Sequence, residues 1–275
     1  MAGTLYVVAT PLGNHEDITL RALRVLKEVD CIAAEDTRHS RKLLTHYGIA
    51  TPLTSYHDHV ERERAPRLVE RLHAGEDIAL ISDAGTPGIA DRGYRLVRAA
   101  IEAGVRVVPI PGPSMVIAGL SAAGLPTDRF AFEGFVPAKA AARRAFFAAL
   151  RAEPRTLVCF EAGRRLAESL RDLADALGAR PVVIAREVSK IYEDFVRGDA
   201  DELAARGADL TPRGEVTLFI GAAVGPAQQQ SEEELRAAIS SLRGEGLHLK
   251  EIAKRLAKES GWSAREIYRL GLEEG

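Results

Sequence analysis

A pair of neighbouring carboxylates is the first group in the sequence that could do chemistry. Glu35 and Asp36 follow the apolar run CIAA, and Arg38 and Arg41 come soon after them. Asp36 precedes a helical pattern, and its side chain can cap that helix. Capping does not also explain Glu35, so this carboxylate can either form a structural ion pair or serve as a general base.

Three loops of small residues form a second candidate site. They are TPLGN (10–14), SDAGTPG (82–88) and PGPSM (111–115). Glycine and proline suit a tight turn, but a backbone without bulky side chains also lets a ligand approach closely. The loops match no common phosphate-binding fingerprint, and Ser114 does not lie in a G-x-S-x-G elbow. These patterns argue against a P-loop nucleotide hydrolase and against a serine hydrolase.

The histidines of SYHDH give a weaker signal. His57 and His59 flank Asp58, which is compatible with a metal site, but a cysteine or third histidine is missing nearby. A polar loop explains this spacing better than a set of metal ligands does. We therefore expect no metal.

The segment 137–171 carries much positive charge within a nearly neutral chain. It contains eight Lys or Arg residues, among them Lys139, and three Glu residues. A basic surface of this kind would suit a substrate that carries phosphate groups.

These residues need a scaffold, and the apolar pattern predicts one of alternating strands and helices. Short β-branched runs alternate with amphipathic segments, which indicates an α/β fold with largely parallel sheets. Asp17 is the expected cap of the first helix, which follows it. Ten predicted strands fit two sheets of about five strands better than one large sheet. We expect the strands at 5–9, 30–34, 52–55, 78–82, 105–110, 130–135, 155–160, 181–186, 192–197 and 215–220.

The unusual loops all come directly after predicted strands. In an open α/β sheet, ligands bind at the edge formed by the carboxyl ends of the strands, so we expect a ligand cleft there. The loops are TPLGN, EDTRHS, SDAGTPG, PGPSM, FVPAK, EAGRR and REVSK.

Changes in composition divide the chain into three parts. Gly, Pro and polar residues gather at 119–129, and GPAQQQ at 225–230 is typical of a linker. We therefore expect an N-terminal α/β domain at 1–119, a second α/β domain at 120–225 and a helical tail at 229–275.

The tail has a pattern like that of a helix–turn–helix. Ser231 with Glu234, and Ser263 with Glu266, are capping boxes that indicate the starts of two helices. A helical packing module explains the pattern better than direct reading of DNA does, so a DNA partner is not expected.

The composition is that of a globular protein. Of 275 residues, 46% are hydrophobic and 28% are charged, and the formal net charge is −2. Cys31 and Cys159 each lie in an apolar run, so we expect no disulfide framework. The first residues lack a signal-peptide pattern, and no apolar run approaches the ~20 residues of a membrane span. We therefore expect a cytoplasmic protein without a membrane partner.

Five stretches together carry a resemblance to a known family. The sequence over most of 4–221 resembles the tetrapyrrole methylase superfamily, and within it the ribose 2′-O-methyltransferases that act on a cytidine of small-subunit (16S) ribosomal RNA. The stretches are LYVVATPLGNHEDITLRALRVLKEVDCIAAEDTRHSRKLL, LISDAGTPGIAD, VVPIPGPS, FEGFVPAK and IAREVSKIYEDFVRG.

The resemblance implies two α/β domains, S-adenosylmethionine in the cleft between them, and a homodimer. It further implies small-subunit ribosomal RNA or the 30S subunit as the partner. The residues implied in cofactor binding are Pro11, Leu12, Asp83, Gly85, Thr86, Ile89, Ser114, Met115, Phe160 and Thr217. The run EAGRRL (161–166), Arg92, His15 and Val60 depart from the family's usual residues, which concerns the substrate side more than the cofactor site.

The implied reaction is attack of a ribose 2′-oxygen on the methyl group of a sulfonium. Positioning and desolvation supply much of such a catalysis, and a general base or a stabilising cation helps because a 2′-hydroxyl is a poor acid. Glu35 is the first candidate for the base. Arg38 or Lys139 is the candidate that orients phosphate or stabilises the oxyanion.

Two other functions compete with methylation of ribosomal RNA. One is a methyltransferase of a tetrapyrrole or another small molecule on the same fold. The other is a DNA-binding regulator built on the tail, with the α/β part as a ligand sensor. The basic segment and the helical tail favour an RNA substrate, because a small-molecule enzyme needs neither of them.

Overall fold

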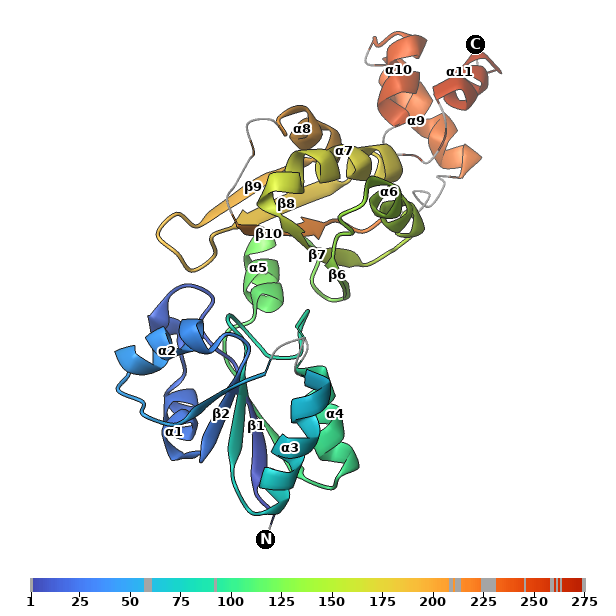
Figure 1. Ribbon diagram of the computed structural model, residues 1–275. Helices are drawn as coiled ribbons and strands as arrows, with labels where there is room; N and C mark the ends of the chain where they lie inside the picture. The colour runs from blue at the N-terminus through green and yellow to red at the C-terminus, as the bar shows by residue number, and fades with distance from the viewer. Residues whose placement is uncertain are drawn as a thin grey trace. The chain divides into compact units, whose positions relative to one another are not determined.

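The fold is described from a computed structural model of the chain (Figure 1). The described residues are 2–56, 61–91, 93–207, 210, 214–223, 231–244, 246–257, 260, 262 and 264–273. They belong to two compact units. The first joins Met1–Ala148 to Arg155–Gly221 and holds both β-sheets, and the second joins Ala149–Pro154 to Ala222–Gly275.

The first sheet has the strand order β3-β2-β4-β1-β5, and all its pairs are parallel. In its register, Leu5 lies opposite Ile78 and Val107. The strands β2 and β4 are buried along their whole length, as expected where helices cover both faces of a parallel sheet. The strands are β1 (Thr4–Val8), β2 (Cys31–Ala34), β3 (Leu53–Ser55), β4 (Ile78–Ile81) and β5 (Arg106–Ile110).

Helices cover both faces of this sheet. The core on one face includes buried residues of α1 and α2, and the core on the other face includes those of α3 and α4. Figure 1 shows this arrangement, with α1 and α2 on one side of the strands and α3 and α4 on the other. The helices are α1 (Leu20–Glu28), α2 (Thr37–His46), α3 (Glu61–His73) and α4 (Tyr94–Glu102), and a 3-10 turn, η1 (His15–Asp17), precedes α1.

The start of α1 differs from the prediction. Asp17 was expected to cap this helix, and this is wrong, because Asp17 lies within the 3-10 turn η1. The cap is Thr19, whose Oγ1 accepts a hydrogen bond from the N–H of Ala22 at 3.1 Å. Aspartate and threonine both cap helices well, so the path of the turn decides between them.

The second sheet has the order β6-β7-β10-β8-β9 and is mixed rather than largely parallel, so that expectation is wrong here. Only the pair β6 and β7 is parallel, while β10 runs antiparallel to β7 and β8, and β9 antiparallel to β8. The link 187–193 between β8 and β9 is too short for the crossover that parallel neighbours need. The strands are β6 (Phe130–Phe135), β7 (Thr156–Ala162), β8 (Pro181–Arg186), β9 (Asp194–Asp199) and β10 (Glu215–Ile220).

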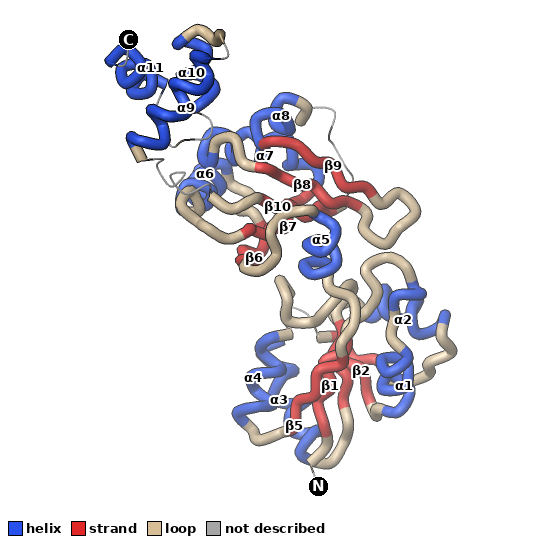
Figure 2. The backbone as a smooth tube through the Cα atoms, turned by 180° about the vertical axis from the view of Figure 1, so that it is seen from behind, coloured by secondary structure: helices blue, strands red, loops and turns tan. Residues whose placement is uncertain are grey.

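The helices of the second sheet are unequally divided. Figure 2 shows α5 on one side and α6, α7 and α8 on the other. Val116 and Leu120 of α5 pack against Val158 and Phe219 of the sheet. The helices are α5 (Met115–Ala123), α6 (Ala140–Ala149), α7 (Leu166–Leu177) and α8 (Ala200–Ala205), with a 3-10 turn, η2 (Gly163–Arg165), before α7.

The second unit is helical in its described part. Buried residues that include Leu235, Ile252 and Ile267 form one core between its three long helices. The capping box at Ser231 and Glu234 is confirmed, because each of these residues accepts a hydrogen bond from the backbone N–H of the other. The helices are α9 (Glu232–Gly244), α10 (Leu249–Leu256) and α11 (Ala264–Glu273).

Some expectations remain predictions. The limits 1–119, 120–225 and 229–275 are among them, and the first boundary falls within α5. The run at 57–59, Val60, Arg92, the expected linker 225–230 and Ser263 lie outside the described residues. Among the described residues, the structure has no helix with the length and apolar composition that crossing a membrane requires.

Candidate functional site

The loops that follow the strands of the first sheet are hydrogen-bonded to one another. Thr10 and Gly85 exchange two backbone hydrogen bonds, of 2.8 and 3.0 Å. Thr86 Oγ1 donates to Pro113 O at 3.0 Å, and the N–H of Asp36 donates to Asp83 Oδ1 at 3.1 Å. The loops after β1, β2, β4 and β5 therefore meet at one edge of the sheet, as their places after parallel strands predicted, and the binding of a ligand there stays a prediction.

Gly85 allows this close packing of loops. Its φ of 79° lies in the left-handed region, where side chains are strained. A Cβ atom here would lie 3.2 Å from Leu12 Cδ2, tighter than normal packing. Glycine is thus required both by its backbone angle and by the adjacent TPLGN loop.

Asp36 is a helix cap, as the sequence predicted. Its Oδ1 accepts hydrogen bonds from the N–H groups of Arg38 and His39, at 2.7 and 3.3 Å. These two bonds hold the pKa of the Asp36 carboxyl below its ordinary value. Glu35 next to it accepts a 3.4 Å hydrogen bond from the N–H of Asp83, so its carboxylate lies at the same edge.

A cavity of about 310 Å³ brings together four of the predicted cofactor-binding residues, which are Leu12, Met115, Phe160 and Thr217. Apolar residues form much of its lining, and its charged members are Glu187, Glu215 and Lys190, so acidic residues outnumber the basic one. Such a lining suits a ligand with a flat apolar part and a positive charge. The residues present therefore fit S-adenosylmethionine.

The other predicted cofactor residues lie in the loops around this cavity rather than on its lining. Pro11 and Gly85 are buried, and Asp83 and Thr86 are tied into hydrogen bonds between loops. Ser114 is the N-cap residue of α5. The side chain of Ile89 is 45% exposed. Their contacts with a cofactor remain predictions.

The three predicted catalytic residues are not on the lining of this cavity. Arg38 has a side chain that is 93% exposed and lies 3.8 Å from Asp36 Oδ1. Lys139 is exposed in the segment before α6, and Glu35 is exposed beside Asp83. Their catalytic roles remain predictions.

Sequence reasoning missed much of the cavity. It singled out the loop REVSK after β8, but neither Glu187 nor Lys190 as a site residue. Because β10 runs antiparallel to β8, its amino end lies beside the carboxyl end of β8, and Thr217 lies opposite Ala185. The missed lining residues are Ala84, Ala185, Glu187, Val188, Lys190, Gly214, Glu215 and Val216.

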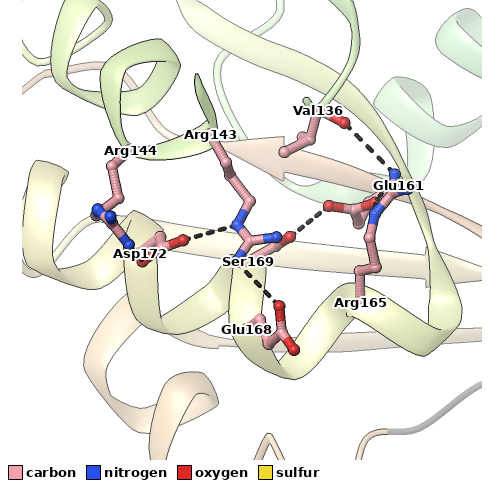
Figure 3. Close-up of polar contacts among 8 residues, drawn as sticks. All are labelled: Val136, Arg143, Arg144, Glu161, Arg165, Glu168, Ser169 and Asp172. Carbon is pink, nitrogen blue, oxygen red and sulfur yellow. Dashed lines mark hydrogen bonds and ion pairs between the residues drawn. The ribbon is translucent and has the colours of Figure 1, made fainter. Parts of the chain in front are cut away.

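Figure 3 shows that side chains of the basic segment 137–171 form ion pairs and hydrogen bonds within the protein, beside the second sheet. The fully buried Glu161 accepts hydrogen bonds from Ser169 Oγ and from Arg165 Nε, the latter at 2.9 Å. Arg143 is 3% exposed and donates to Asp172 Oδ2 at 2.7 Å, and its second partner is Glu168. The guanidinium of Arg143 therefore adds nothing to a phosphate-binding surface.

Both cysteines are buried and free, as expected. Burial, with the charges of Glu133 and Glu161 nearby, raises the pKa of the Cys159 thiol to about 12. The thiol stays protonated at neutral pH and is a core side chain rather than a nucleophile.

The chain is similar to curated proteins along nearly its whole length. It is 47% identical over 284 residues to "Ribosomal RNA small subunit methyltransferase I" of Pseudomonas aeruginosa, with 99% of this chain and 98% of the relative covered. It is 46% identical over 273 residues to the protein of the same name from Synechocystis, with 98% of each covered.

The fold is also found in solved structures. A uroporphyrin-III C-methyltransferase from Thermus thermophilus, complexed with S-adenyl homocysteine, superimposes with a TM-score of 0.54 at 23% identity. The match covers 81% of this chain and 99% of that one. In addition, residues 4–204 match the family model described as tetrapyrrole (corrin/porphyrin) methylases. The chain therefore belongs to the tetrapyrrole methylase family.

Proposed function

We propose that this chain transfers a methyl group from S-adenosylmethionine to the ribose 2′-oxygen of a cytidine in small-subunit (16S) ribosomal RNA. The observation that carries the proposal is the 47% identity, over nearly the full length of both chains, to a relative named for small-subunit ribosomal RNA methylation. Both the α/β unit and the helical tail fall within this similarity.

The cavity supports the proposed donor. Leu12, Met115 and Phe160 would contact the apolar part of S-adenosylmethionine, and the carboxylate of Glu215 would offset its charge. When bound, the donor supplies a methyl group activated by a positive sulfur. The structural neighbour complexed with S-adenyl homocysteine is consistent with this choice of donor.

The same proposal also includes the partner, the cellular location and the oligomeric state. The partner is the ribosomal RNA or the 30S subunit, in the cytoplasm, and the enzyme acts as a homodimer. Arg38 and Lys139 are exposed cations that can contact phosphates of the RNA. Light scattering on the purified chain would test the dimer.

Methylation of a tetrapyrrole or another small molecule is the second candidate, favoured by the fold of the uroporphyrin-III C-methyltransferase neighbour. The test compares transfer of labelled methyl groups to small subunits that lack the modification with transfer to uroporphyrinogen III. We expect label in the RNA, recovered as 2′-O-methylcytidine after digestion. Label in the tetrapyrrole alone would contradict the proposal.

A further inference from the structure

A second cavity, of about 680 Å³ and largely open to solvent, lies beside Lys190. Its volume is in the range of sites that hold a small organic ligand. In the described part of the chain, Lys190 lines both this cavity and the 310 Å³ cavity, so its side chain borders both spaces. The wider cavity is lined by Gly13, Asn14, His15, Ser189, Lys190 and Ile191.

The loop that carries Lys190 is held in a strained conformation. Glu187 and Ser189 both have left-handed backbone angles, with φ of 50° and 64°, although neither is glycine. Ser189 N–H donates to Glu193 Oε2 at 2.6 Å, and Ser189 Oγ accepts from Asn14 N–H at 3.2 Å. Strain maintained by such contacts is common where a protein positions functional groups.

Two contacts position the Lys190 side chain. Its Nζ lies 3.2 Å from Glu187 Oε1. Its stem passes over Gly13, where a Cβ atom would collide with Cγ and lie 2.7 Å from Cε. A glycine in the loop after β1 thus leaves room for a lysine from the loop after β8.

We propose that the wider cavity binds the nucleotide to be methylated, with its ribose 2′-oxygen at Lys190 and Glu187 and its base beside His15. This inference rests on the proposed function. The donor and the acceptor would then occupy neighbouring cavities, with Lys190 at their boundary.

The surface around the wider cavity suits an unpaired nucleotide. His15 is exposed, and its ring packs against His46 with centroids 4.7 Å apart, which provides a supported aromatic face. Ile191 and Tyr192 are 90% and 82% exposed next to it. Proteins recognise single-stranded RNA by stacking splayed bases on side chains of this kind.

The chemistry at the boundary follows from the charges. The ammonium of Lys190 stabilises negative charge that develops on the ribose oxygen, and the Glu187 carboxylate takes its proton. The oxygen forms a bond to the methyl carbon while the bond from that carbon to sulfur breaks, and the electron pair of the broken bond stays on sulfur. Glu187 then releases the proton to water.

Lys190→Met tests the inference, because it removes the charge and keeps a similar stem. We expect kcat on unmodified small subunits to fall about 100-fold, while the donor affinity, measured by calorimetry, changes far less, because Lys190 only borders the donor cavity. Gly13→Ala should lower kcat as well, since it displaces the lysine without changing any charge. Wild-type kcat in Lys190→Met, or a loss of donor affinity as large as the loss of turnover, would overturn the inference.

The matched control is Lys27→Met, an exposed lysine in the last turn of α1, which runs away from the edge that carries the loops. We expect it to leave kcat and donor affinity unchanged. A short single-stranded RNA with a photoreactive base provides a readout without turnover. Cross-links to 13–15 or 189–191 are expected, and cross-links confined to other segments would overturn the inference.

These two readouts separate this inference from the proposed function. If the wild-type chain binds the donor but leaves small subunits unmethylated, the proposed function fails, and the cross-linked residues still decide whether the wider cavity binds a nucleotide. If the wild-type chain methylates the RNA and the Lys190→Met variant does so equally well, only the inference fails.

Discussion

In the first sheet, the residues that line the 310 Å³ cavity come from loops after parallel strands, whereas in the second sheet they come largely from a hairpin and from the start of an antiparallel strand. Leu12, Ala84 and Met115 follow β1, β4 and β5. Lys190 lies between β8 and β9, and Glu215 begins β10. The first group can be recognised in the sequence because its loops share small residues. The second group cannot, because its place at the cavity depends on the direction of the strands.

The two regions also differ in what their charged residues do. At the first edge, Asp36 accepts hydrogen bonds from backbone N–H groups of the first turn of α2, and Asp83 accepts one from the N–H of Asp36. In the second sheet, Glu161 of β7 is fully buried and accepts hydrogen bonds from the side chains of Arg165 and Ser169. The charged residues around the second sheet therefore divide into an internal cluster that stabilises the fold and an exposed group at the cavity.

The largest effect is expected from breaking the internal cluster. Glu161→Ala leaves Arg165 and Ser169 without their shared acceptor and should lower the free energy of unfolding by about 3 kcal/mol. The measurement is urea unfolding followed by circular dichroism. Glu168→Ala is the control, because its side chain is 62% exposed beside Arg143 and should cost less than about 1 kcal/mol. Equal losses would contradict the division between internal and exposed charges.

Substituting two carboxylates in turn tests whether the first or the second sheet supplies the general base. Glu187→Gln should lower kcat about 100-fold with unchanged donor affinity, because Glu187 takes the proton in the inferred site. Glu35→Gln should have a much smaller effect on kcat, since the carboxylate of Glu35 lies at the N–H of Asp83. Steady-state methyl transfer to small subunits measures both. The reverse ranking would restore the sequence-based assignment to Glu35.

A third test asks whether the first-sheet loops form the donor site. Gly85→Leu forces a side chain into left-handed backbone against Leu12 and should weaken donor binding by at least about tenfold, or ~1.4 kcal/mol, in calorimetry. Gly104→Leu is the matched control, since its φ is 72° and a Cβ atom there would meet nothing within 4 Å among the described residues. It should lose stability through the same backbone strain but keep its donor affinity. Unchanged donor affinity in Gly85→Leu would mean that SDAGTPG is only a turn and does not contribute to the donor site.

The sequence predicted all ten strands with small shifts at their ends, because short apolar runs such as IALIS and EVTLFI have few alternatives to the strand conformation. The edge of the first sheet was predictable because each of its loops directly follows a parallel strand. The antiparallel direction of β10 was not, since direction depends on how the chain returns through α8 rather than on any residue of the strand.

Local backbone conformation limited the prediction in the loops. The sequence pattern predicted Asp17 as the cap of α1, but Asp17 lies in the 3-10 turn at His15–Asp17 and Thr19 caps the helix. In the loop after β8, Glu187 and Ser189 adopt left-handed angles without a glycine that would reveal them. The position of Lys190 at the cavity depends on this loop, so its place in the candidate site could not be predicted from REVSK alone.

The smallest effect concerns the cap at the first edge. Hydrogen bonds from Arg38 and His39 N–H lower the pKa of Asp36 in the folded chain, so the ionised cap stabilises the fold above the unfolded pKa and loses this contribution as pH falls through the folded one. Asp36→Asn keeps a capping oxygen but cannot ionise. The wild-type chain should therefore have a slightly higher Tm at pH 7, and the difference should vanish in acid, below the folded pKa. A difference that persists there would mean that the advantage of Asp36 over Asn does not come from its charge, because both residues keep the backbone N–H that bonds to Asp83.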